Sequence, residues 1–127
     1  MESVTPNLFV KNMKKTVAFY KDLGFQLSMT VPEEGDDFIW TMMNCGNAVL
    51  MFQTIGSLDK GDLPEIKRKT GGSLLLYFKT KGIKTFFDSI KEKVKLLKGV
   101  KKTFYGATEF TIIDCDGYVL TFAEDEE

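Results

Sequence analysis

The 127-residue sequence predicts an α+β fold built from two tandem βαβββ modules. In each half a β-prone run leads into an amphipathic helix pattern, and three further β-type segments follow the helix. A polar stretch with Gly, Pro and mixed charge, residues 56–71, separates the halves. Neither half has a sheet large enough to bury both of its faces. We therefore expect one curved eight-stranded mixed sheet around a concave pocket, with the helices outside.

The first module covers about residues 1–55. Its β-prone run, residues 5–10, is followed by Asn12, a good N-cap for a helix over residues 13–22. Gly24 then ends this helix as a C′ residue. Three strands complete the module, at residues 25–31, 37–43 and 48–54.

The second module covers about residues 72–124, so the whole chain, residues 1–127, is expected to form a single domain. A strand at residues 73–80 precedes a helix whose apolar stripe consists of Ile83, Phe86, Phe87, Ile90 and Val94. The remaining strands are predicted near residues 95–98, 109–114 and 118–123.

A tight turn joins the last two strands. The carboxylates of Asp114 and Asp116 can accept bonds from backbone N–H groups just ahead, and Gly117 supplies a positive φ. Both aspartates are therefore interpreted as turn residues. Glu124 lies beyond the predicted strand and is interpreted as part of a frayed acidic tail.

Composition excludes several classes of function. The 17 basic and 18 acidic residues nearly cancel, so no sequence-wide charge favours nucleic acid or a membrane surface as a partner. The basic run at residues 91–102 is interpreted as a solvated face rather than a phosphate-binding patch. No apolar run approaches the roughly 20 residues that span a bilayer.

The absence of histidine excludes imidazole-dependent triads and HExxH zinc sites. Cys45 and Cys115 lack the spacing of a metal site, and the N-terminus lacks a signal-peptide pattern. We therefore expect a cytoplasmic protein with free thiols.

The final hairpin resembles the Asp-Pro-Asp-Gly ending of the vicinal oxygen chelate superfamily, which includes glyoxalase I, bleomycin-resistance proteins, fosfomycin-resistance proteins and extradiol dioxygenases. Cys115 occupies the position where that family usually has proline. Residues 19–25, Phe-Tyr-Lys-Asp-Leu-Gly-Phe, are similar to another family signature. The two stretches bracket nearly the whole chain. The resemblance implies the fold predicted above and a homodimer in which the partner completes each ligand site.

The resemblance also implies four metal-ligand positions on the first and last strands of each module. Carried over to this sequence, they fall on Thr5, Met51, Ser73 and Thr121. Divalent ions need carboxylate or imidazole ligands, which hydroxyls and one thioether do not replace. We therefore expect no metal and no cofactor, and the family's metal-dependent activities do not transfer.

Strand alternation predicts which side chains face the pocket. The inward set includes Thr5, Asn7, Phe9, Val49, Met51, Gln53, Ser73, Leu75, Tyr77, Val119, Thr121 and Ala123. Candidate ligand-binding residues are Trp40, Met42, Met51, Gln53, Tyr77, Tyr105 and Thr121, a mostly apolar and aromatic set with a few polar tips, as in small-molecule pockets. The alternative is that these side chains pack together and leave no cavity. Glu109 is the carboxylate placed near the pocket mouth, and no residue is assigned a catalytic role.

Three functions remain open. The favoured one is a metal-free protein of the bleomycin-resistance type that binds a small aromatic or amphipathic molecule. The second is a metal-dependent lyase, isomerase or dioxygenase of the same superfamily, and the third is a ligand-free interaction or regulatory module. Trp40 has two possible places: stacked against a ligand in the hollow, or on the opposite sheet face under the helix that carries Phe86 and Phe87.

Overall fold

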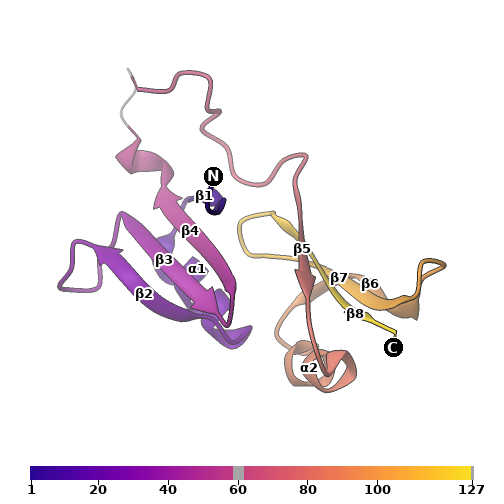
Figure 1. Ribbon diagram of the computed structural model, residues 1–127. Helices are drawn as coiled ribbons and strands as arrows, with labels where there is room; N and C mark the ends of the chain where they lie inside the picture. The colour runs from indigo at the N-terminus through magenta and orange to yellow at the C-terminus, as the bar shows by residue number, and fades with distance from the viewer. Residues whose placement is uncertain (59–61, 127) are drawn as a thin grey trace. The chain divides into compact units, whose positions relative to one another are not determined.

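The computed structural model describes residues 1–58 and 62–126 and contains two successive βαβββ modules (Figure 1). The chain divides into two compact units, Met1–Thr70 and Gly71–Glu127, with one module in each. Hydrogen bonding of the described strands gives two mixed sheets of four strands rather than one sheet of eight. The α+β class and the two βαβββ modules predicted from the sequence are confirmed.

Module one has its first and last strands paired in parallel. Its elements are β1 (Asn7–Val10), α1 (Met13–Asp22), β2 (Gln26–Val31), β3 (Trp40–Cys45) and β4 (Ala48–Thr54), followed by a 3-10 turn, η1 (Ile55–Ser57). The sheet order is β1-β4-β3-β2, with the other two pairings antiparallel.

The ends of α1 match their sequence signals. The Asn12 side chain accepts a hydrogen bond from the Lys15 N–H at 3.2 Å, and Gly24 after the helix has φ +102. The core of the module lies between α1 and one face of the sheet, where Val10, Tyr20, Met43 and Phe52 are fully buried. Alternation therefore leaves the next residue along each strand on the opposite face.

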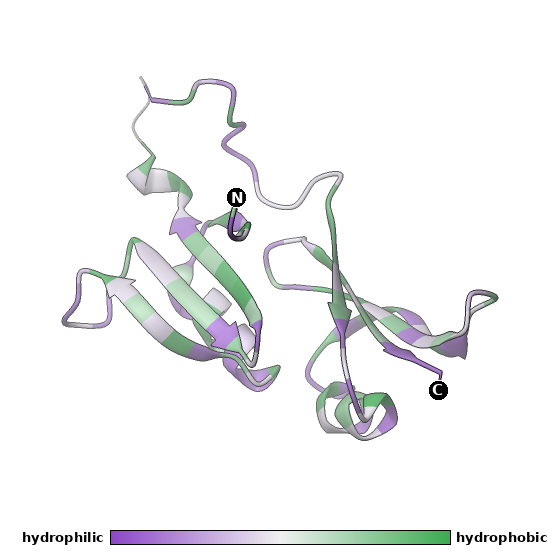
Figure 2. Ribbon diagram, viewed as in Figure 1, coloured by the Kyte–Doolittle hydropathy of each residue, from purple (hydrophilic) through white to green (hydrophobic). Residues whose placement is uncertain are grey.

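Module two repeats this arrangement with β5 (Leu75–Lys79), α2 (Ile83–Ile90), β6 (Lys95–Lys102), β7 (Ala107–Ile113) and β8 (Val119–Asp125) in sheet order β5-β8-β7-β6. Green and purple residues are interleaved around α2 in Figure 2. Its apolar side packs aromatic rings against the sheet: Phe87 lies 5.0 Å from Phe110, and Phe86 lies 5.0 Å from Phe122.

The hairpin turn is confirmed as predicted. Asp114 Oδ1 accepts hydrogen bonds from the N–H groups of Asp116 and Tyr118, both at 2.8 Å, and Gly117 has φ +89. Asp114 is buried, so its role is to bind the backbone of the turn.

Three predictions in module two need correction. The strand predicted near residues 95–98 extends to Lys102, and the helix ends at Ile90 instead of continuing to Val94. Glu124 is no frayed tail, because it lies inside β8 and its carboxylate accepts hydrogen bonds from the N–H groups of Gly82 at 2.9 Å and Ile83 at 3.2 Å. It caps α2, whose N-cap residue, Gly82, has no side chain to do so.

Candidate ligand-binding site

A hollow of about 680 Å³ lies on the face of the module-two sheet opposite α2. We call it the module-two hollow. The strands contribute Leu75, Tyr77, Glu109, Thr111, Val119 and Thr121 to its lining. The register pairs Tyr77 with Thr121 and Thr121 with Thr111, which confirms the alternation predicted for this sheet. The end of β6 and the loop after it add Leu97, Lys98, Lys101, Lys102, Phe104 and Tyr105.

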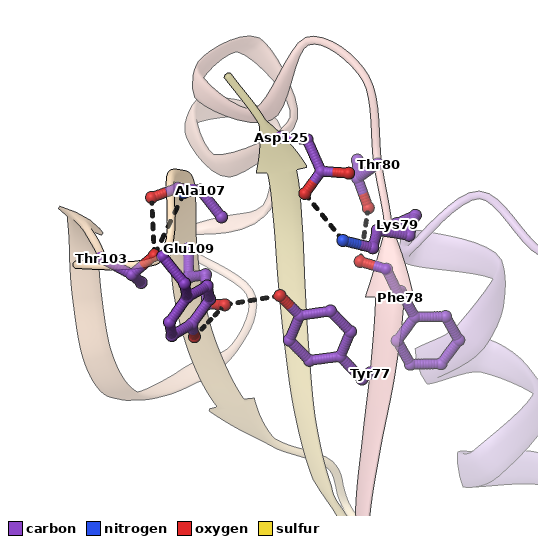
Figure 3. Close-up of polar contacts among 9 residues, drawn as sticks. Tyr77, Phe78, Lys79, Thr80, Thr103, Ala107, Glu109 and Asp125 are labelled. Atoms are coloured by element: carbon purple, nitrogen blue, oxygen red, sulfur yellow. Dashed lines mark hydrogen bonds and ion pairs between the residues drawn. The ribbon is translucent and has the colours of Figure 1, made fainter. Parts of the chain in front are cut away.

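Two tyrosine hydroxyls meet one carboxylate in this hollow (Figure 3). Tyr77 donates to Glu109 Oε2 at 2.6 Å, and Tyr105 donates to the same oxygen at 2.5 Å. Tyr77 stands on β5 and Glu109 on β7, so the Tyr77 ring reaches across β8, where Thr121 and Ala123 present small, buried side chains. The predicted place of Glu109 beside Tyr105 is thus confirmed.

The cluster fixes the protonation of its members. The hydrogen bond to Glu109 raises the pKa of Tyr77 and of Tyr105, and partial burial and the charge of Glu109 act in the same direction. Desolvation pushes the pKa of Glu109 up, but the two phenol donors and the nearby charges of Lys101 and Lys79 outweigh it, so the pKa is lowered. Ionised Glu109 between two neutral phenols suits recognition better than proton transfer.

The side chains of module two do not fill this face. Tyr105 is 57% exposed and Leu75 is 52% exposed, although both are large apolar or aromatic residues at the hollow. The floor carries a polar pair, because the hydroxyls of Thr111 and Thr121 share a hydrogen bond at 2.8 Å. The hollow therefore offers aromatic walls and a few hydrogen-bonding groups, as small-molecule sites do.

Lysines form one side of the hollow, and sequence reasoning missed this role. Lys98, Lys101 and Lys102 belong to the run that was interpreted as a solvated face; they are exposed, but they also line the hollow. On β5, Lys79 forms an ion pair with Asp125 at 2.7 Å and lies 5.3 Å from the centre of the Tyr77 ring. The bulges that turn β6 toward the hollow leave no clear signal in the sequence.

The remaining candidate residues share one face of the module-one sheet. Trp40 pairs with Gln53 and Met42 pairs with Met51, and their strand neighbours Thr41 and Phe52 are buried on the α1 side. Trp40 is therefore on the sheet face opposite α1. Gln53 accepts a hydrogen bond from the Asn7 amide at 3.0 Å and donates to Ser57 at 3.3 Å.

The residues at the family's metal positions do not fit a divalent ion. Thr5 and Ser73 precede their strands, and the residues opposite Met51 and Thr121 are Asn7 and Tyr77. The Thr121 hydroxyl is engaged with Thr111. Residues 1–58 and 62–126 contain no group of three or more Cys, Asp or Glu side chains placed to hold a metal. No chemical step is assigned to a metal here.

Neither helix in the described ranges is long and apolar enough to cross a membrane.

Comparison with known proteins identifies the family. The sequence profile of the Glyoxalase/Bleomycin resistance protein/Dioxygenase superfamily matches residues 3–122. No curated protein matches the chain. Among solved structures, a protein of unknown function from Agrobacterium tumefaciens is 23% identical, with a TM-score of 0.78, and the match covers 98% of this chain and 94% of that one.

Two further structures of similar fold are named for bleomycin. A bleomycin-binding protein complexed with bleomycin is 20% identical with a TM-score of 0.68, covering 99% of this chain and 100% of the other. The bleomycin resistance determinant of transposon Tn5 is 20% identical with a TM-score of 0.70, covering 100% of both chains. These identities support the fold alone. Because the family profile spans nearly the whole sequence, the chain belongs to the glyoxalase/bleomycin resistance protein/dioxygenase superfamily.

Proposed function

We propose that this protein binds a small aromatic or amphipathic molecule in the module-two hollow and does so without a metal. The observation that carries the proposal is the hollow itself, about 680 Å³ of space bordered by exposed aromatic and apolar side chains. A volume of this size is within the range of small-molecule sites. A ligand would cover apolar surface that module two leaves open to water.

Each candidate residue has a role in this proposal. Tyr77 and Tyr105 supply aromatic contact, and Glu109 holds their hydroxyls in place. Thr121, at the floor, supplies a hydroxyl for hydrogen bonding. Module one by itself carries a separate surface of suitable chemistry on the sheet face with Trp40, Met42, Met51 and Gln53, an indole and two thioethers beside an amide.

The comparisons support small-molecule binding on this fold without naming the ligand. The structure with bleomycin bound has the same fold at 20% identity, too distant to transfer its ligand. We propose binding rather than catalysis because Glu109 and its tyrosines are held in fixed protonation states, and no carboxylate or imidazole occupies the metal positions. The exposed thiols of Cys45 and Cys115 suit the reducing cytoplasm that we propose as its location.

Binding by metal-depleted protein tests the proposal. Protein treated with EDTA should bind members of a panel of planar aromatic compounds, bleomycin among them, and its melting temperature should be unchanged. Tyr105→Ala and Thr121→Val should weaken that binding. Tyr118→Phe is the matched control, since Tyr118 is buried and lies outside the lining.

Elemental analysis near one metal per chain, lost together with stability in EDTA, would overturn the proposal. So would a complete failure of the metal-depleted protein to bind any member of the panel.

A further inference from the structure

We propose that the ligand of the module-two hollow is an aromatic anion: a flat apolar body carrying a carboxylate, sulfonate or phosphate group that the lysines of β6 recognise. This inference rests on the proposed function, since it names the chemical class of the molecule bound there.

Irregularities in β6 bring two lysines to one face. Leu96 pairs with Ile112, on the face covered by α2, and regular alternation would place Lys98 on that face and Lys101 on the other. The register shifts between Leu96 and Lys98, and again between Lys98 and Lys101. As a result Lys98 pairs with Thr111 and Lys101 with Glu109, both on the hollow face. Bulges commonly redirect side chains toward a site in this way.

The charge of the lining favours an anion. Three lysines line the hollow against one carboxylate among the described residues, and that carboxylate, Glu109, already accepts two phenol hydroxyls. Lys102 has an ion-pair partner, Glu126, at 3.8 Å. In the described part of the chain, Lys98 and Lys101 have no ion pair. Lys98 can therefore pair with an incoming anion, and Lys101, whose charge also helps to lower the pKa of Glu109, adds positive charge beside it.

The aromatic groups are less suited to a cation. Lys79 Nζ already lies 5.3 Å from the Tyr77 ring centre, so one face of that ring already carries a cation. Phe104 and Tyr105 form an edge-to-face pair with ring centres 5.0 Å apart, and Phe104 is 99% exposed. These rings suit a flat apolar body whose charged group points toward Lys98 and Lys101.

Three naphthalene probes of nearly equal size test the inference: 2-naphthoate, 2-naphthylmethanol and 2-naphthylmethylammonium. Binding is followed by NMR shifts of backbone amides in the full-length protein. We expect shifts at the hollow residues of β5, β7 and β8, and about tenfold tighter binding of the naphthoate than of the ammonium probe, the effect of two surface charge pairs.

The double variant Lys98→Met, Lys101→Met should lose the preference for the naphthoate while keeping its affinity for the neutral alcohol. The control Lys84→Met, Lys93→Met makes the same change in net charge at exposed positions outside the lining and should retain the preference. Matching melting temperatures of the two double variants exclude an effect of folding.

The outcomes separate the two proposals. Equal affinity for all three probes, or tighter binding of the ammonium probe, overturns the aromatic anion and leaves the proposed function standing. A preference that survives in the Lys98 and Lys101 double variant also overturns it. If no probe shifts the amides around the hollow, both proposals fall.

Discussion

Glu109 stabilises its surroundings over a limited range of pH. Its pKa is lowered, so its contribution to stability is present above the ordinary carboxyl range and is lost as pH falls through its folded-state pKa. The pKa of Tyr77 is raised, so its contribution is present below the ordinary phenol pKa, about 10, and is lost as pH rises through the folded value. The hydrogen-bonded cluster is therefore intact between the two ranges.

Glu109→Gln should shift the titration of Tyr77 and Tyr105 to lower pH. The substitution removes the negative charge that disfavours tyrosinate and leaves one acceptor oxygen in place of a carboxylate. Ultraviolet difference titration of the four tyrosines measures the change. Glu92→Gln, at an exposed position after α2, is the control. If the phenol titration curves of the two variants coincide, Glu109 does not hold the two tyrosine hydroxyls.

Trp40→Ala should lower the folding stability only slightly and should lower the ligand affinity by more. Trp40 is only half-buried on the face opposite α1, so we expect about 1 kcal/mol of lost folding free energy. If the residue contacts the ligand, affinity should fall by roughly 1–3 kcal/mol. Phe52→Ala is the matched comparison because Phe52 is fully buried on the α1 side, and it should cost roughly 3–5 kcal/mol of stability. Similar denaturant midpoints for the two variants would show that Trp40 is a core residue.

At the scale of elements, α2 depends on a strand that is distant in sequence. The carboxylate of Glu124 accepts hydrogen bonds from two N–H groups at the helix N-terminus, and these backbone donors lower its pKa. A negative charge there also interacts favourably with the helix dipole. The cap stabilises the folded protein at pH values above the ordinary carboxyl pKa. This stabilisation is lost as pH falls through the folded-state pKa of Glu124.

Glu124→Gln should therefore lower the melting temperature at neutral pH, and the difference from wild type should shrink as the solution is acidified. Thermal melts at several pH values measure it. Glu126→Gln removes the same charge nearby, where the carboxylate has only a surface ion pair at 3.8 Å, and should change little. A gap between Glu124→Gln and wild type that stays constant on acidification would rule out the carboxylate as the cap.

Gly71→Ala should destabilise module two through a backbone contact. A Cβ at Gly71 would lie 2.7 Å from the Gly117 carbonyl oxygen, and Gly71 has φ +76. We expect a loss of roughly 1–3 kcal/mol in unfolding free energy. Gly106→Ala is the control, because Gly106 has φ +84 with nothing within 4 Å of its added Cβ. Denaturation curves should show a larger loss for Gly71→Ala; equal losses would mean that φ alone matters.

The elements predicted best from the sequence are those with signals at both ends. The predicted bounds of α1 agree with the structure because Asn12 and Gly24 mark its limits. The last part of β6 could not be predicted, because Lys98, Lys101 and Lys102 on an exposed edge strand lack the apolar alternation of a half-buried strand. In the site, alternation predicts Tyr77 and Thr121, and the start of the seventh predicted strand places Glu109 beside Tyr105. The lysines depend on bulges, which alternation does not indicate.

At the scale of the whole molecule, the described strands form two four-stranded sheets, one with edge strands β1 and β2 and the other with edge strands β5 and β6. Exposed edges and apolar side chains favour association with a second copy. The family resemblance also implies a homodimer. We propose that two chains pair, and that the pairing covers part of the exposed apolar surface, which includes Phe104 and Leu75.

Light scattering at tens of micromolar should give a mass twice that of the 14.4 kDa chain. Phe104→Ser should reduce association if that ring is covered in the pair, and Leu63→Ser, a change at another exposed apolar residue, serves for comparison. A monomer mass for the wild type over this concentration range would reject the homodimer.

The parallel pairing of β5 with β8 also affects how the protein is made. A ribosome releases β5 long before β8, so the nascent second module has an unpaired strand edge until β8 emerges. Phe122 arrives with that same strand, and its ring stacks on Phe110 at 5.2 Å and lies 5.0 Å from Phe86. The carboxylate that caps α2 arrives with it too. A chain stalled after β7 therefore exposes Phe86, Phe87 and Phe110 together, and this half-made module is the species that a chaperone would bind.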